Sequence, residues 1–137
     1  MNKESILLVQ ESFRKVAPIA DAAAKIFYTR LFTIAPPLRA LFKGDLSEQG
    51  RMLMAALGMA VNGLSQPETI AKTVRDLGVR HRGYGVKEEH YKIVGEALIF
   101  TLETGLGSAF NDSLRQAWLE AYALLSGLMI EASKSEA

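Results

Sequence analysis

The residues of this sequence best suited to bind a metal are two histidines, His81 and His90, and no cysteine accompanies them. Proteins hold transition metals chiefly through imidazole nitrogen and thiolate sulfur, so these two side chains limit any metal site that the chain builds alone. Paired ligands on one helix face are usually four residues apart, whereas these are nine apart, which argues against a zinc site made from both. A metal site formed by one histidine together with a cofactor is the alternative that remains open.

The two histidines lie in different surroundings. His81 belongs to the segment Arg80-His-Arg-Gly-Tyr-Gly-Val86, in which a helical pattern meets Gly83 and Gly85. Glycine allows a chain to turn sharply, here beneath a bulky group. The alternative is a surface histidine between two arginines. His90 follows a run of charged residues in which nothing requires a ligand, and we interpret it as structural.

Four other residues could shape a binding pocket. Gln49 and Leu53 are four apart in a helical pattern, so one polar and one branched apolar group can overhang the same point. Tyr28 and Phe42 are aromatic residues fourteen positions apart. Each of the four also has a simpler explanation, since a helical glutamine is usually solvated and an aromatic side chain is usually part of the core.

Two small residues permit a close crossing of the helices that carry these pocket candidates. Ala24 precedes Tyr28 by one helical turn, and Gly50 follows Gln49. Bulk at either position would hold the two helices apart. We therefore expect the helices to approach each other closely at this point.

The elements that must position these residues are predicted to be helices. Four prolines, at positions 18, 36, 37 and 67, divide the chain, and the intervals between them have helical rather than alternating apolar spacing. A first helix ends before Pro18, and a second runs from about Asp21 to Ile34. The Pro36-Pro37 pair begins a short third turn. The apolar stripe of the first helix consists of Ile6, Val9, Phe13 and Val16.

Capping signals and two further stripes complete the helical pattern. Asp45-Leu-Ser-Glu48 is typical of a capping box before a helix that continues to about Leu64. Ser65-Gln-Pro-Glu68 repeats this pattern before a segment that we expect to end at Gly78, since proline is tolerated in a first helical turn. Strands are hard to place, and we predict an all-α chain. The last two helices carry the stripes Tyr91, Val94, Leu98 and Leu102, and Leu114, Trp118, Ala121, Leu125 and Leu128.

Composition and charge argue against several classes of protein. The chain has 16 basic and 15 acidic residues and a formal charge of +1, so it lacks the strong field that steers nucleic acid. The N-terminus lacks a signal peptide's long apolar region, and no apolar stretch approaches the 18 or so residues of a membrane helix. The absence of cysteine fits a reducing compartment. We expect a single cytoplasmic domain over residues 1–137 that neither binds nucleic acid nor inserts into a membrane.

The order and spacing of several features carry a family resemblance. Phe42 follows the Pro-Pro turn, His81 precedes the two glycines, and His90-Tyr-Lys-Ile-Val-Gly95 follows them. Together these segments resemble the bacterial globins, including single-domain haemoglobins and the globin part of flavohaemoglobins, over nearly the whole chain. The resemblance implies an all-α globin fold, a three-over-three helical sandwich around a pocket for haem b (iron protoporphyrin IX).

The resemblance also implies roles for individual residues. His81 would hold the haem iron through Nε2, with its other ring nitrogen turned toward a carbonyl of the preceding helical turn. Tyr28, Gln49 and Leu53 would form the distal ligand pocket, in which the Tyr28 hydroxyl donates to bound dioxygen. The remaining haem contacts would be Phe42, stacked against the porphyrin, Arg80, which fits a propionate partner better than Arg82 does, and Val86, Tyr91 and Val94.

One position departs from the family pattern. Flavohaemoglobins and their single-domain relatives often couple the residue corresponding to Tyr91 to a glutamate on the last helix, which is thought to push electron density onto the proximal histidine. An ungapped alignment from Tyr122 puts Ser133 at that glutamate position, with Glu131 nearby. Whether this chain has a strong proximal push is therefore left open by the sequence.

Three functions remain open at this point. The first is reversible binding of O2, and of NO or CO, at a five-coordinate ferrous haem, for oxygen delivery or gas handling and with no catalytic residue. The second is enzymatic, a nitric oxide dioxygenase that depends on a separate reductase, since the sequence shows no flavin or nicotinamide domain. The third is a globin-shaped sensor or interaction module that binds no haem, in which the histidine and tyrosine serve packing alone.

Overall fold

Residues 1–135, which are those that the computed structural model describes, form helices and short turns with no strand among them. The all-α prediction is confirmed over these residues. Short 3-10 turns connect several of the helices, and Pro18 and the Pro36-Pro37 pair lie in two of them, as expected. The elements in chain order are α1 (Lys3–Val16), η1 (Ala17–Ile19), α2 (Ala20–Ile34), η2 (Pro36–Leu41), α3 (Leu46–Asn62), η3 (Gly63–Ser65), α4 (Pro67–Gly83), α5 (Glu88–Leu106), η4 (Gly107–Ala109) and α6 (Asp112–Ser135).

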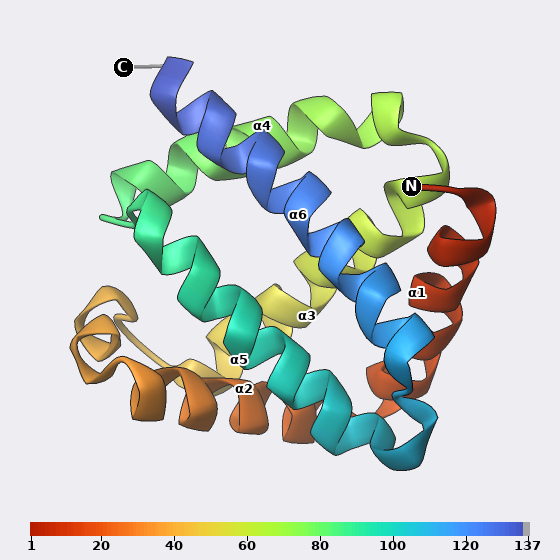
Figure 1. Ribbon diagram of the computed structural model, residues 1–137. Coiled ribbons are helices and arrows are strands. Elements are labelled where there is room, and N and C mark those ends of the chain that lie inside the picture. The colour runs from red at the N-terminus through yellow and green to blue at the C-terminus, as the bar shows by residue number, and fades with distance from the viewer. Residues whose placement is uncertain (136–137) are drawn as a thin grey trace.

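The helices pack in crossed pairs. The most extensive contacts join α4 with α6 and α2 with α5, and α2 also packs on α3. In Figure 1, α6 crosses α4 near the C-terminal end of the chain, and α3 lies behind α5 and α6. Helices α3 and α4 follow each other through η3, yet they barely contact each other directly. None of the helices in residues 1–135 is both long and apolar enough to span a membrane.

The core receives buried side chains from each of the helices α1 to α6, and its largest side chain lies at the contact between α1 and α6. Trp118 of α6 is 1% exposed, and its ring lies 6.5 Å from that of Phe13 on α1. The indole Nε1 donates to the Ser12 hydroxyl oxygen at 2.9 Å, so the polar end of this large side chain keeps a partner inside the core. Val9 and Val16 are likewise buried, as the predicted stripe of the first helix requires.

The two predicted capping boxes differ in outcome. Asp45 accepts a hydrogen bond from the Ser47 amide at 2.9 Å and so caps α3, but the side chain of Glu48 is exposed and forms no return bond within residues 1–135. The second box is wrong, because the Ser65 hydroxyl donates backward to the preceding turn and no side chain caps α4. Pro67 is the first residue of α4, where its missing amide costs nothing.

The expected end of α4 at Gly78 is also wrong. The helix continues to Gly83 and therefore includes His81. A Cβ atom on Gly78 would lie 2.2 Å from the Met129 carbonyl oxygen and 2.6 Å from Met129 Cα. Glycine occurs here because α4 and α6 cross backbone against backbone, and a glycine at a crossing looks the same in a sequence as a glycine at a helix end.

We therefore expect Gly78→Ala to destabilise the protein. The new methyl group would have to push the backbones of α4 and α6 apart, at a cost of about 1–3 kcal/mol in the free energy of unfolding. The matched control is Gly127→Ala on α6, where only the helix's own backbone surrounds the added Cβ and where alanine should stabilise by about 0.5–1 kcal/mol. Urea titrations of both variants check this, and equal stabilisation by the two substitutions would contradict the close crossing.

Candidate functional site

His81 lies in the last turn of α4 and is half-buried. Its Nδ1 is 2.6 Å from the Leu77 carbonyl oxygen, one helical turn earlier. Because a carbonyl oxygen can only accept, Nδ1 carries a hydrogen, and in the neutral imidazole Nε2 then keeps its lone pair. Within residues 1–135, no group of three or more His, Asp or Glu side chains is arranged to hold a metal ion. The imidazole is thus oriented and polarised in the way that metal-ligating histidines are.

The chain turns immediately after this histidine. The amides of Tyr84 and Val86 both donate to the His81 carbonyl oxygen, at 3.1 and 3.0 Å. Gly85 has a φ of +94°, a left-handed conformation that favours glycine, as the sequence predicted for this turn. A Cβ on Gly85 would lie 3.4 Å from Leu41 Cδ2, so the turn packs against the end of η2.

A second group of candidate residues forms an aromatic cluster between α2 and η2. The Tyr28 ring lies 5.3 Å from that of Phe42 and 5.9 Å from that of Phe32. Phe32 and Phe42 meet edge to face at 5.5 Å and so close the cluster. Sequence reasoning missed Phe32, although its position four residues after Tyr28 in the predicted second helix was an available signal.

The Tyr28 hydroxyl is a hydrogen-bond donor without a partner in residues 1–135. The side chain is 7% exposed, and burial raises its pKa above the ordinary value of 10.0, so the phenol stays neutral and protonated at physiological pH. A Cβ on Gly50 would lie 2.8 Å from Ala24 Cβ and 3.6 Å from Tyr28 Cε2. The predicted close crossing of α2 and α3 is confirmed, and it brings Tyr28 against the first turns of α3.

The two candidates on α3 lie near this cluster in different ways. The Gln49 amide donates to the Lys43 carbonyl oxygen, so its side chain is turned toward the loop just after Phe42. Leu53, one turn later, is half-buried and packs against the core. The structure therefore brings Tyr28, Phe42 and the start of α3 together, with the Gln49 side chain at the edge of the group.

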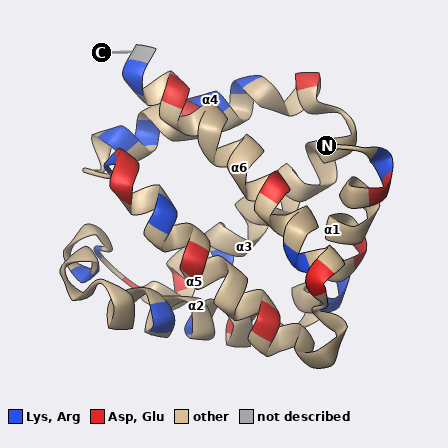
Figure 2. Cartoon of the chain, in the orientation of Figure 1, with Lys and Arg blue, Asp and Glu red and all other residues tan. Residues whose placement is uncertain are grey.

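The arginines that flank His81 differ in their contacts. The last turn of α4 is basic, as Figure 2 also shows. Arg80 is exposed and has no partner in the described part of the chain. Arg82 donates from Nη1 to the Ser133 carbonyl oxygen at 2.7 Å and is attached to α6. Of the two, Arg80 is the one free to bind an anionic group.

The remaining candidates lie on or just before α5. Val86 and Val94 are half-buried, and Val94 packs against the core. Tyr91 is buried, which raises the pKa of its phenol, and its backbone carbonyl accepts from the Tyr122 hydroxyl at 2.5 Å. His90 accepts through Nδ1 from the Lys87 amide at 3.0 Å, a capping role that confirms its interpretation as structural.

The position on α6 at which the resemblance suggested a glutamate is occupied by Ser133. The Ser133 hydroxyl donates to the Ile130 carbonyl oxygen at 2.7 Å, within its own helix. Glu131 is exposed. Neither side chain bonds to Tyr91 among residues 1–135, so the proximal network that the resemblance suggested does not include these groups.

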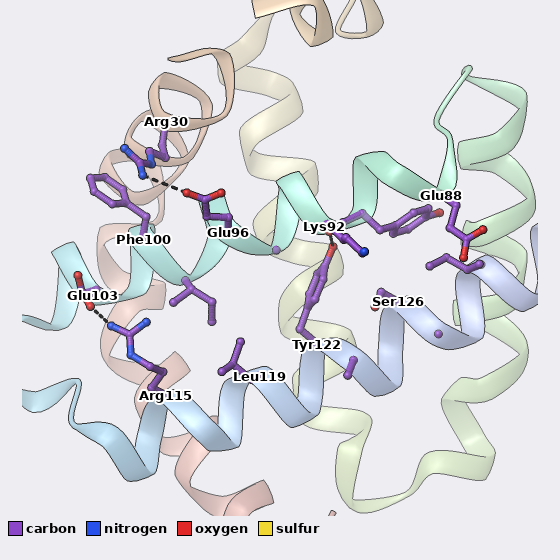
Figure 3. A pocket seen from close by; sticks show the side chains of 16 residues that line it. Arg30, Glu88, Lys92, Glu96, Phe100, Glu103, Arg115, Leu119, Tyr122 and Ser126 are labelled. Carbon is purple, nitrogen blue, oxygen red and sulfur yellow. Dashed lines mark hydrogen bonds and ion pairs between the residues drawn. The ribbon is translucent and has the colours of Figure 1, made fainter. Parts of the chain in front are cut away.

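A groove of about 790 Å³ lies elsewhere, between α5 and α6 (Figure 3). Its rim carries the ion pairs Arg30–Glu96, at 3.2 Å, and Arg115–Glu103. All four side chains are at least a third exposed, so each pair contributes at most about 1 kcal/mol to stability. His81 does not line this groove. The opposite charges of the two ion pairs on the rim of the groove cancel locally. We therefore assign the candidate site to His81 and the aromatic cluster.

Comparisons with known proteins agree on one family. The family model described as "Globin" matches residues 25–129. A flavohemoprotein of Halalkalibacterium halodurans is 31% identical over 137 residues, which cover 98% of this chain and 33% of that protein. Neuroglobin of Danio rerio is 29% identical, over 89% of this chain and 86% of that protein. The chain thus spans about a third of the length of the flavohemoprotein that it matches.

Two solved structures share the whole arrangement of helices. A bacterial globin from Campylobacter jejuni is 25% identical to this chain. The alignment covers 98% of each of the two chains and gives a TM-score of 0.87. An engineered carbene transferase from Rhodothermus marinus is 26% identical, covers 99% of this chain and 95% of that chain, and gives a TM-score of 0.89.

Proposed function

The chain belongs to the globin family, with the all-α globin fold predicted from its sequence, and on that premise we propose that it binds haem b and takes up O2, NO or CO reversibly. Globins are a haem-binding family, which supports the cofactor in general terms. The observation that carries the proposal for this chain is the His81 imidazole, whose Nδ1–H is bound to the Leu77 carbonyl and whose Nε2 is left as a ligand.

The residues present fit a haem group. Helices α3 and α4 barely contact each other, and apolar side chains at the end of η2, on α3 and on or just before α5 remain half-buried. A flat apolar group bound against these side chains would cover them and gain about 25 cal/mol for each Å² removed from water. The half-buried residues that would hold it are Leu41, Phe42, Leu53, Leu57, Val86 and Val94. The exposed guanidinium of Arg80 would pair with a propionate.

Bound haem would supply a ferrous iron that holds a diatomic gas at a free coordination position. The residues of the chain would do the rest. His81 would hold the iron from one side, while Phe42 and Leu53 exclude water from the other. The Tyr28 hydroxyl would donate a hydrogen bond to a gas ligand that carries partial negative charge. Gln49, now bound to the Lys43 carbonyl, would have to rotate to contribute a second donor.

The test of this function is a cycle of oxygenation. We expect the reduced, haem-loaded protein to give two distinct absorption spectra under argon and under air, and to pass between them repeatedly, because the apolar side chains around the haem slow oxidation of the iron. Complete conversion to the ferric form in the first exposure to air would contradict reversible binding as the function.

A second candidate function is nitric oxide dioxygenation, which would use the same site. The specific observation in its favour is the structural neighbour from Rhodothermus marinus, which is described as a candidate nitric oxide dioxygenase. His81 would hold the haem and Tyr28 would donate a hydrogen bond to its ligand, while the haem would supply the redox chemistry that converts nitric oxide and dioxygen to nitrate, with a reductase as the source of electrons. Consumption of NO beyond one equivalent per haem, with a reductase and NADH present, would favour this activity, and a halt after a single turnover would count against it.

A further inference from the structure

The end of α4 is attached to α6 on both sides of His81. Gly78, three residues before the histidine, lies against Met129, where an added Cβ would come within 2.2 Å of the backbone oxygen. Arg82, one residue after the histidine, donates to the Ser133 carbonyl oxygen at 2.7 Å across 51 residues of sequence. No other pair of helices packs more extensively than α4 and α6. The segment that carries the histidine is therefore held mainly by α6.

The Arg82 bond joins two helix ends, which are the parts of helices that fray most readily. Ser133 lies in the last turn of α6, where backbone carbonyls lack helical donors and the negative end of the helix dipole favours a cation. A guanidinium satisfies both requirements through a charge-assisted hydrogen bond. Because Arg82 is exposed, water screens the interaction, and we expect little effect on global stability. We expect the Arg82 bond to affect the position of the last turn of α4 instead.

His81 must follow any movement of that turn. Its Nδ1 is bound to the Leu77 carbonyl of the same helix, so the ring is fixed to α4 and has no bond to another element within residues 1–135. Arg80 cannot replace Arg82 as the attachment, because residues two apart on a helix point in different directions and Arg80 has no partner in the described chain.

We propose that Arg82 is a positioning residue, which fixes the last turn of α4 to the Ser133 carbonyl and thereby determines how firmly the His81 imidazole holds the haem iron. The proposal rests on the proposed function, because only a ligated histidine gives the position of this turn a chemical consequence. Arg82 would act through His81, because its guanidinium is bound to the Ser133 carbonyl.

The first test measures the turn itself, in protein without haem. Arg82→Met keeps much of the side-chain length but removes every donor, and we expect backbone amides in residues 80–86 to exchange about three- to tenfold faster, with the rest of α4 unchanged. Arg82→Lys, which keeps a cationic donor, should restore most of the protection. The matched control is Arg75→Met on the same helix, an exposed arginine without a partner in residues 1–135. Equal exchange in Arg82→Met and Arg75→Met would overturn the proposal.

The second test measures the bond to iron. In the reduced, ligand-free protein, resonance Raman spectroscopy should show an iron–histidine stretching band that broadens and moves to lower frequency in Arg82→Met, stays near its original position in Arg82→Lys and is unchanged in Arg75→Met. An unchanged band in Arg82→Met would overturn the positioning role and leave the proposed function intact. Absence of the band from the unsubstituted protein would overturn both.

Discussion

Replacing His81 with glycine is expected to lower the affinity of the protein for haem by about a hundredfold or more. Loss of a partner that merely orients a metal ligand costs 10–100-fold in affinity, and loss of the ligand itself should cost at least as much. Titration of the apoprotein with haemin, followed by absorbance, measures the change. Added imidazole should restore much of the original spectrum, because glycine leaves the space of the lost ring empty.

The matched control for this experiment is the other histidine. His90→Gln keeps an acceptor for the Lys87 amide, which His90 binds at 3.0 Å, and so preserves the start of α5. We expect its haem affinity and spectrum to match those of the unsubstituted protein. If His81→Gly bound haem as tightly as His90→Gln, with the same spectrum, His81 could not be the ligand.

Tyr28→Phe is expected to raise the rate constant for O2 dissociation by about tenfold to a hundredfold. The substitution removes only the hydroxyl, which has no partner within residues 1–135, and leaves the ring packed against Phe32 and Phe42. A hydrogen bond to a charged acceptor is worth about 1.5–3 kcal/mol, which corresponds to that range. Stopped-flow displacement of O2 by CO measures the rate.

Two comparisons make the Tyr28 experiment specific. Tyr122→Phe removes another tyrosine hydroxyl, which donates to the Tyr91 carbonyl and is not part of the aromatic cluster, and it should leave the rate unchanged. A phenol donates only below its pKa, and burial raises the pKa of Tyr28 above 10.0, so the rate in the unsubstituted protein should stay constant from about pH 6 to pH 9. Equal dissociation rates in Tyr28→Phe and the unsubstituted protein would rule out this donor role.

The helices could be predicted because their boundaries depend on local chemistry. Proline at positions 18, 36 and 67 and the Asp45 cap each determine a helix end through the backbone bonds that they remove or satisfy, and α2 and α3 begin and end within two residues of the prediction. Gly78 failed for the opposite reason. What requires glycine there is the Met129 backbone, 51 residues away in the sequence, and no local pattern reveals such a neighbour.

The candidate site could be predicted only in part, and the division has a physical basis. His81 and the Gly85 turn lie within five residues of each other, so their arrangement follows from local geometry. The Gln49 side chain could be assigned to a helix face, but a flexible amide binds whichever carbonyl its rotamers reach, here that of Lys43. The Arg82 contact with Ser133 depends on how α4 crosses α6, which no spacing in the sequence gives. The single-domain prediction for residues 1–137 and the roles of the individual haem contacts stay predictions.

The measurement that tests the central claim most directly is the absorption spectrum of the purified protein after addition of one equivalent of haemin, taken in the ferric, reduced and CO-bound states. The proposed ligation by His81 predicts stoichiometric binding, a strong Soret band and a CO-bound spectrum typical of histidine-ligated ferrous haem. A titration that leaves haemin with the spectrum it has in buffer, or a CO complex without histidine opposite the gas, would contradict it.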